Sequence, residues 1–147
     1  MTRPTGSNTA LGGGGLHHVA LKTRDWDKSM AFYGDVMGFV PRVAWSMPNG
    51  NRATMLDTGE GNYLEIFEDP AYESQADGAL LHLAIRTSDV TAATERVRAA
   101  GMTITMEPKD VAIANTAPGL GAPVPVRISF FRGPNGEIWE FFQNELT

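Results

Sequence analysis

The sequence predicts an α+β fold made of two tandem βαβββ modules, and three observations support this prediction. The stretch LHHVALKTRD, from Leu16 to Asp25, returns with few changes as LLHLAIRTSD, from Leu80 to Asp89. Both copies alternate polar or small residues with aliphatic ones, the period of a half-buried strand, and both end at an Asp that can cap a helix. Later in each copy a short apolar segment carries a central glutamate, in YLEIF and in IWEFF.

The first module is predicted to span about residues 16–68. Its helix begins after Asp25, has apolar residues at helical spacing and ends at Gly38. Pro41 lacks an amide hydrogen, so the second strand is expected at a sheet edge or with a bulge. Tight turns are expected at Asn49-Gly50 and at 59–62. The expected elements are a strand at 16–22, a helix at 26–37 and strands at 39–46, 52–57 and 63–67.

The second module is predicted to span about residues 80–144, after an acidic linker at 68–78, EDPAYESQADG. An apolar stripe from Val90 to Ala100 indicates a helix that Gly101 ends. This copy is longer than the first, and the Pro- and Gly-rich segment 115–125 is expected to hold the additional residues as a long loop. The expected strands lie at 80–86, 103–106, 126–131 and 138–143.

The composition favours a single globular domain that handles small molecules. The chain has 147 residues, 42% of them hydrophobic, and a net charge of −5, so no basic surface for nucleic acid or an anionic membrane is expected. It contains no Cys, which leaves His, Asp and Glu as metal ligands and fits a cytoplasmic protein. Residues 1–15 lack the apolar core of a signal peptide and are predicted to be a flexible tail, so the domain is expected at 16–147.

Two histidines and two glutamates stand at corresponding positions of the two copies. His18 and His82 lie on the first strand of each module, and Glu65 and Glu140 on the last. A two-fold axis relating the copies would bring all four together. A buried carboxylate without a partner costs several kcal/mol, roughly, and a divalent cation would neutralise both carboxylates. The alternative is that each glutamate pairs with a basic neighbour, for which the candidates are Lys22, Arg86 and Arg127.

Three further residues near this predicted site have distinct expected roles. Strand alternation turns His17 to the helix-covered face, away from His18, which predicts a structural role. Lys22 and Arg86 share a face with the histidines and are expected either to hold a carboxylate or phosphate of a substrate or to be solvated strand ends.

The segment LHHVALKTRDWDKSMAFYGDVMGF resembles the opening of vicinal oxygen chelate superfamily proteins, and PNGEIWEFF resembles their closing motif. The resemblance covers nearly all of 16–143 and implies a half-open, eight-stranded barrel of two βαβββ modules around a divalent metal. The implied ligand set is most similar to that of short bacterial glyoxalase I, or lactoylglutathione lyase. Extradiol dioxygenases of the superfamily bind iron with two His and one Glu. The implied ligands in this chain are His18, Glu65, His82 and Glu140.

The chain departs from glyoxalase I at two positions. Those enzymes typically hold glutathione with an Arg four residues after the first ligand and an Asn four residues after the second, where this chain has Lys22 and Asp69. The carboxylate of Asp69 would repel the carboxylates of glutathione.

The resemblance implies a metal-dependent lyase or isomerase that removes a proton from a small carbonyl compound and stabilises the enediolate on the metal. Glu140 is the expected base and Glu65 the other candidate. The ligands suit Ni, Co, Zn, Mn or Fe. A 2-acyl epimerase, an extradiol-type dioxygenase or a drug-sequestering binding protein are the alternatives, and the intact ligand set disfavours the last. The expected partners are a substrate with vicinal oxygens and, by resemblance, a second copy in a homodimer.

Overall fold

The computed structural model describes residues 16–74, 80–116 and 123–143. The chain divides into two compact units, with the boundary after Tyr72, inside the predicted acidic linker. The predicted tail at 1–15 and much of the predicted loop at 115–125 lie outside the described residues. No helix in the described part of the chain is long and apolar enough to cross a membrane.

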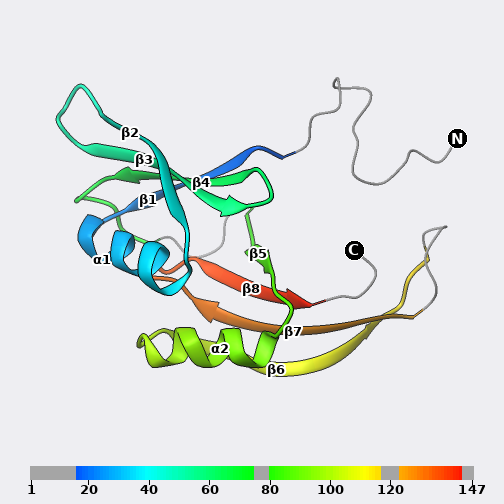
Figure 1. The fold of residues 1–147 in the computed structure, drawn as a ribbon. Coiled ribbons are helices and arrows are strands. Elements are labelled where there is room, and N and C mark those ends of the chain that lie inside the picture. Colours follow the sequence, from blue (N-terminus) through cyan, green and yellow to red (C-terminus); the bar gives the residue numbers. More distant parts are fainter. Residues whose placement is uncertain (1–15, 75–79, 117–122, 144–147) are drawn as a thin grey trace, which may run out of the picture. The chain divides into compact units, whose positions relative to one another are not determined.

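The first module contains one helical segment and one mixed sheet (Figure 1). The sheet has the order β1-β4-β3-β2, in which β1 is parallel to β4 and the other neighbours are antiparallel. Buried apolar side chains from β3 and β4 belong to its core, among them Leu56, Leu64 and Ile66. The elements are β1 (His18–Thr23), α1 (Trp26–Met30), η2 (Ala31–Val36), β2 (Val40–Ser46), β3 (Arg52–Gly59) and β4 (Asn62–Glu68).

The helical segment begins as predicted but changes its winding. The Asp25 side chain accepts a hydrogen bond from the Lys28 amide at 3.0 Å, which caps α1. After Met30 the chain continues as the π-helix η2, so the predicted single α-helix at 26–37 is wrong in its second half. Phe32 and Tyr33, adjacent in sequence, are both buried in this wider turn.

Strand β2 confirms the expectation attached to Pro41. The strand lies at the edge of the first sheet, and its pairing register with β3 shifts between Pro41 and Val43. An edge strand tolerates a residue without an amide hydrogen because that side of the strand has no partner.

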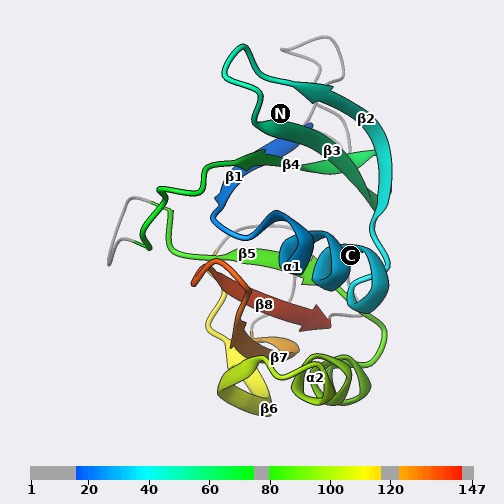
Figure 2. The same ribbon diagram turned by 90° about the vertical axis from the view of Figure 1, so that its left-hand side faces the viewer.

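The second module repeats the order of the first, as β5-β8-β7-β6, again with one parallel pair, β5 with β8. Helix α2 contacts β6, β7 and β8; it runs along β6 and β7 in Figure 1 and is seen nearly end-on beside the sheet in Figure 2. The Asp89 side chain caps α2 by accepting a hydrogen bond from the Ala92 amide at 2.9 Å. The elements are β5 (Leu83–Arg86), α2 (Val90–Ala99), β6 (Thr103–Ile113), β7 (Val124–Arg132) and β8 (Ile138–Gln143). The α+β class and the two βαβββ modules are therefore confirmed, and each sheet is open.

The additional residues of the second copy lengthen a hairpin. Strand β6 runs to Ile113, well past the predicted end at residue 106, and β7 begins at Val124, inside the segment predicted to be a loop. Pro108 lacks an amide hydrogen, so the sequence pattern did not indicate a strand that continues past it. It lies on an edge strand where the register with β7 shifts between Met106 and Lys109, so the proline is tolerated.

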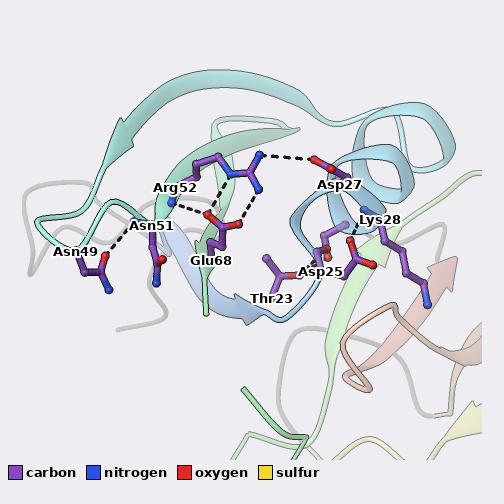
Figure 3. Close-up of polar contacts among 9 residues, drawn as sticks. Thr23, Asp25, Asp27, Lys28, Asn49, Asn51, Arg52 and Glu68 are labelled. Carbon is purple, nitrogen blue, oxygen red and sulfur yellow. Dashed lines mark hydrogen bonds and ion pairs between the residues drawn. The ribbon is translucent and has the colours of Figure 1, made fainter. Parts of the chain in front are cut away.

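A network of charges joins the start of α1 to the sheet of the first module (Figure 3). The Arg52 guanidinium donates to both oxygens of Glu68, at 3.0 and 2.6 Å, and lies over the Trp26 ring with 5.0 Å to its centroid. Its third contact, with the carboxylate of Asp27 at 3.6 Å, is longer and more exposed. These hydrogen bonds from Arg52 lower the pKa of the Glu68 carboxyl to about 2.

We expect Glu68→Gln to destabilise the protein at neutral pH. A carboxyl whose pKa is lower in the folded state stabilises the fold above its ordinary pKa of 4.5, and this stabilisation is lost as the pH falls from there to about 2. Urea unfolding of the wild type and of Glu68→Gln should be measured across this range. The difference in their free energies of unfolding should be largest above pH 4.5 and disappear toward pH 2. Asp27→Asn is the control and should change stability little; a pH-independent effect of Glu68→Gln would contradict the prediction.

Candidate metal centre

Glu65 and His18 form a close pair on one face of the first sheet. Glu65 stands on β4, where its register partners are Ala20 on β1 and Met55 on β3. His18 lies two residues before Ala20 and therefore reaches Glu65 diagonally on the same face. The small side chain of Ala20 leaves room for this contact, and the His18 Nε2 atom lies 3.5 Å from Glu65 Oε2.

The second module builds the same pair from the corresponding residues. Glu140 on β8 stands between Ala84 on β5 and Phe130 on β7 in the register. His82, just before β5, reaches it along the same diagonal, with Nε2 at 3.1 Å from Glu140 Oε2. The His82 ring also packs edge-on against Phe130, with 5.3 Å between ring centroids. Each module thus contains one pair of an imidazole nitrogen and a carboxylate.

The environment of Glu140 makes its charge costly. The residue is only 8% exposed, and this burial raises the pKa of its carboxyl, while the nearby His82 acts in the opposite direction. A bound cation would stabilise a carboxylate that is buried beside an imidazole. Imidazole nitrogen and carboxylate oxygen are donors that suit divalent transition metals. The donor chemistry of each pair therefore fits a metal, although within 16–74, 80–116 and 123–143 no three His, Asp or Glu residues gather into a metal-binding group.

Two of the basic residues considered as partners for the glutamates pair elsewhere. The Lys22 Nζ atom lies 3.1 Å from Asp69 Oδ2, and Arg127 contacts Asp110 at 3.0 Å. Arg86 ends β5, where it is exposed and stands opposite Phe142 in the register. The alternative in which Lys22 or Arg127 neutralises a glutamate is not what the structure adopts.

The expected position of His17 is wrong. Its Nδ1 atom lies 3.0 Å from His18 Nδ1, and its ring packs against Tyr63, with 5.0 Å between centroids. Strand β1 begins only at His18, so the alternation that predicted opposite faces does not extend to residue 17. The adjacent pair of histidines was the available signal for this contact.

Sequence reasoning also missed the ion pair of Lys22 with Asp69, although its signal was present. Lys22 stands opposite Phe67 in the register, and Asp69 lies two residues farther. This is the same diagonal that relates His18 to Glu65, so the equal sequence spacing of the two pairs could have identified it.

Comparisons with known proteins identify the family of the chain. A family model described as Glyoxalase/Bleomycin resistance protein/Dioxygenase superfamily matches residues 15–141, and the chain belongs to this superfamily. It is similar to a probable lactoylglutathione lyase of Vibrio cholerae, 27% identical over 87% of this chain and 89% of that protein. It is also similar to a lactoylglutathione lyase of Haemophilus influenzae, 28% identical over 88% and 93% of the two chains.

A solved structure shows the same fold. Glyoxalase I from Zea mays matches with a TM-score of 0.70 and 21% identity over 88% of this chain. The match covers 44% of the maize chain, so this protein spans less than half of that relative.

Proposed function

We propose that this protein is a divalent-metal-dependent lyase or isomerase of the glyoxalase I type, acting on a small carbonyl substrate. The observation that carries the proposal is the repetition of one His–Glu pair, with the same diagonal geometry, in both modules. The proposed ligands are His18, Glu65, His82 and Glu140. The similarity to proteins named lactoylglutathione lyase supports the reaction class.

The chemistry assigned to the chain is removal of a proton from the carbon next to a carbonyl. When bound, the divalent ion would supply Lewis acidity toward the substrate oxygens. Glu140 is the proposed base, because the family resemblance gives this role to the glutamate of the closing motif and its carboxyl is buried beside His82. Glu65 is the second candidate for this role.

The first experiment is metal analysis of the purified protein followed by a substrate panel. The panel contains the methylglyoxal–glutathione hemithioacetal, a 2-acyl thioester for epimerisation and a catechol with iron and oxygen. Metal-dependent turnover of a carbonyl substrate without oxygen uptake supports the proposal. Oxygen uptake with a catechol would favour a dioxygenase, and binding without turnover or metal would favour a sequestering protein.

We expect weak turnover of the hemithioacetal by the wild type and a gain in Asp69→Asn. The Asp69 carboxylate forms an ion pair with the Lys22 ammonium at 3.1 Å, so this ammonium is not free to bind a glutathione carboxylate. Asp69 also adds a negative charge where the glutathione carboxylates would bind. Like charges in a partly solvated site cost on the order of 1 kcal/mol, so kcat/KM should rise roughly fivefold.

Asp110→Asn removes a carboxylate from another exposed ion pair, with Arg127, and is the matched control. It should leave turnover unchanged. Wild-type kcat/KM of about 10⁴ M⁻¹s⁻¹ or above, in the ordinary enzyme range, would show that glutathione is held without hindrance from Asp69.

A further inference from the structure

The rings of His17 and His18 face each other through like nitrogens. The two Nδ1 atoms are 3.0 Å apart, and the rings meet edge to face, with 5.3 Å between centroids and 86° between planes. Two nitrogen lone pairs at this distance would repel, so one Nδ1 must carry a proton that the other accepts. One of the two neutral imidazoles therefore has its proton on Nδ1.

His17 is held in place independently of this contact. Its carbonyl oxygen accepts a hydrogen bond from the Tyr63 amide at 2.9 Å, beside the first register pair of β1 and β4, His18 with Tyr63. Its ring packs against the Tyr63 ring at an interplanar angle of 30°. These two contacts with Tyr63 fix the orientation of the His17 imidazole beside His18.

The other nitrogen of His18 is less engaged. Its Nε2 atom lies 3.5 Å from Glu65 Oε2, beyond the usual range of about 2.7–3.2 Å for an N–H···O bond. In the second module, by contrast, His82 Nε2 lies 3.1 Å from its glutamate. The better-formed contact of the His18 ring is therefore with His17.

We propose that His17 is a positioning residue, which accepts the Nδ1 proton of His18 and so keeps the His18 Nε2 lone pair directed at the Glu65 side, ready for a divalent cation. The role toward the cation rests on the proposed function, whereas the shared proton does not. A ligand histidine commonly donates its other N–H to such a partner, which fixes its orientation.

The second module orients its histidine differently. Leu81 stands at the position that corresponds to His17 and is 75% exposed. Its side chain has no nitrogen atom that could accept a proton from His82. The His82 ring packs against Phe130 instead. His17→Leu therefore places the residue of one module in the other and is the natural test variant.

The shared proton is tested by ¹⁵N NMR of the metal-free protein at a pH where the imidazoles are neutral. In the wild type, His18 should carry its proton on Nδ1. In His17→Leu, His18 should revert to the Nε2–H form that a free imidazole prefers. An Nε2–H His18 in the wild type would overturn the inference.

The positioning role is tested by calorimetric titration with Zn²⁺. His17→Leu should weaken zinc binding by about 10–100-fold, the usual effect of removing the partner of a ligand histidine. His17→Asn should retain most of the affinity, because its amide oxygen can accept the same proton. Zn²⁺-loaded wild type should show the proton on His18 Nδ1.

The outcomes separate this inference from the proposed function. Equal zinc affinity in the wild type and His17→Leu would overturn the positioning role and leave the proposed metal site intact. If His17→Leu and His17→Asn both lost zinc binding completely, His17 itself would be a metal ligand, which also overturns the inference. A wild type that binds no divalent metal would overturn the proposed function and the positioning role together, while the NMR result would still decide the shared proton.

Discussion

His82→Ala is expected to abolish measurable binding of a divalent metal. The variant removes an imidazole that lies 3.1 Å from a buried carboxylate and leaves that module with a single donor. Losing a ligand should cost more than losing the partner of a ligand, which typically costs about 10–100-fold in affinity, so we expect a decrease beyond about 100-fold. Calorimetry should give one ion per chain for the wild type and no heat of binding for His82→Ala.

The neighbouring Leu81 provides the control for this variant. Its side chain is 75% exposed, so Leu81→Ala changes the same stretch of chain without removing a donor and should keep the metal. Equal metal affinity in His82→Ala and the wild type would show that the proposed ligand set is wrong.

Glu140→Gln is expected to remove metal binding and turnover and, at the same time, to stabilise the metal-free protein near neutral pH. Burial raises the pKa of this carboxyl in the folded state, so its charged form is disfavoured there. Such a group stabilises the fold below its ordinary pKa of 4.5, and that contribution is lost as the pH rises through the higher folded value. A neutral amide of similar size avoids this loss.

Urea unfolding in the presence of a chelator measures this effect. The gain in the free energy of unfolding for Glu140→Gln should be present at pH 7 and vanish well below pH 4.5. Glu68→Gln is the matched comparison with the opposite sign, because Arg52 lowers the pKa of that carboxyl. A Glu140→Gln protein that is less stable than the metal-free wild type at pH 7 would indicate that the carboxylate is stabilised without a metal.

The opposite behaviour of these two glutamates could not be predicted from the sequence. Both lie on the last strand of a module and follow an isoleucine and an aromatic residue, in EIFE and EIWE. What differs is that burial raises the pKa of Glu140 more than His82 lowers it, whereas the hydrogen bonds from Arg52 dominate at Glu68 and lower its pKa. The sign of a pKa shift depends on such partners and on burial, which local sequence does not encode.

The sequence by itself determined the two modules and the correspondence of their histidines and glutamates. A repeated strand with period-two alternation, followed by an Asp cap, depends on interactions within a few residues, so it can be recognised without knowing what packs against it. The edge position of β2 was predictable for the same reason, since Pro41 lacks an amide hydrogen wherever the strand is placed.

Only the tertiary structure decided the features that depend on a partner from elsewhere in the chain. The π-helix η2 accompanies the burial of two adjacent aromatic residues, and β6 extends past Pro108 because β7 pairs with it. His17 contacts His18 because the strand begins at His18, two residues later than predicted, and Lys22 contacts Asp69 because parallel pairing sets the register of β1 and β4. Strand ends and registers are fixed by hydrogen bonds between segments distant in sequence, so alternation within one segment cannot locate them.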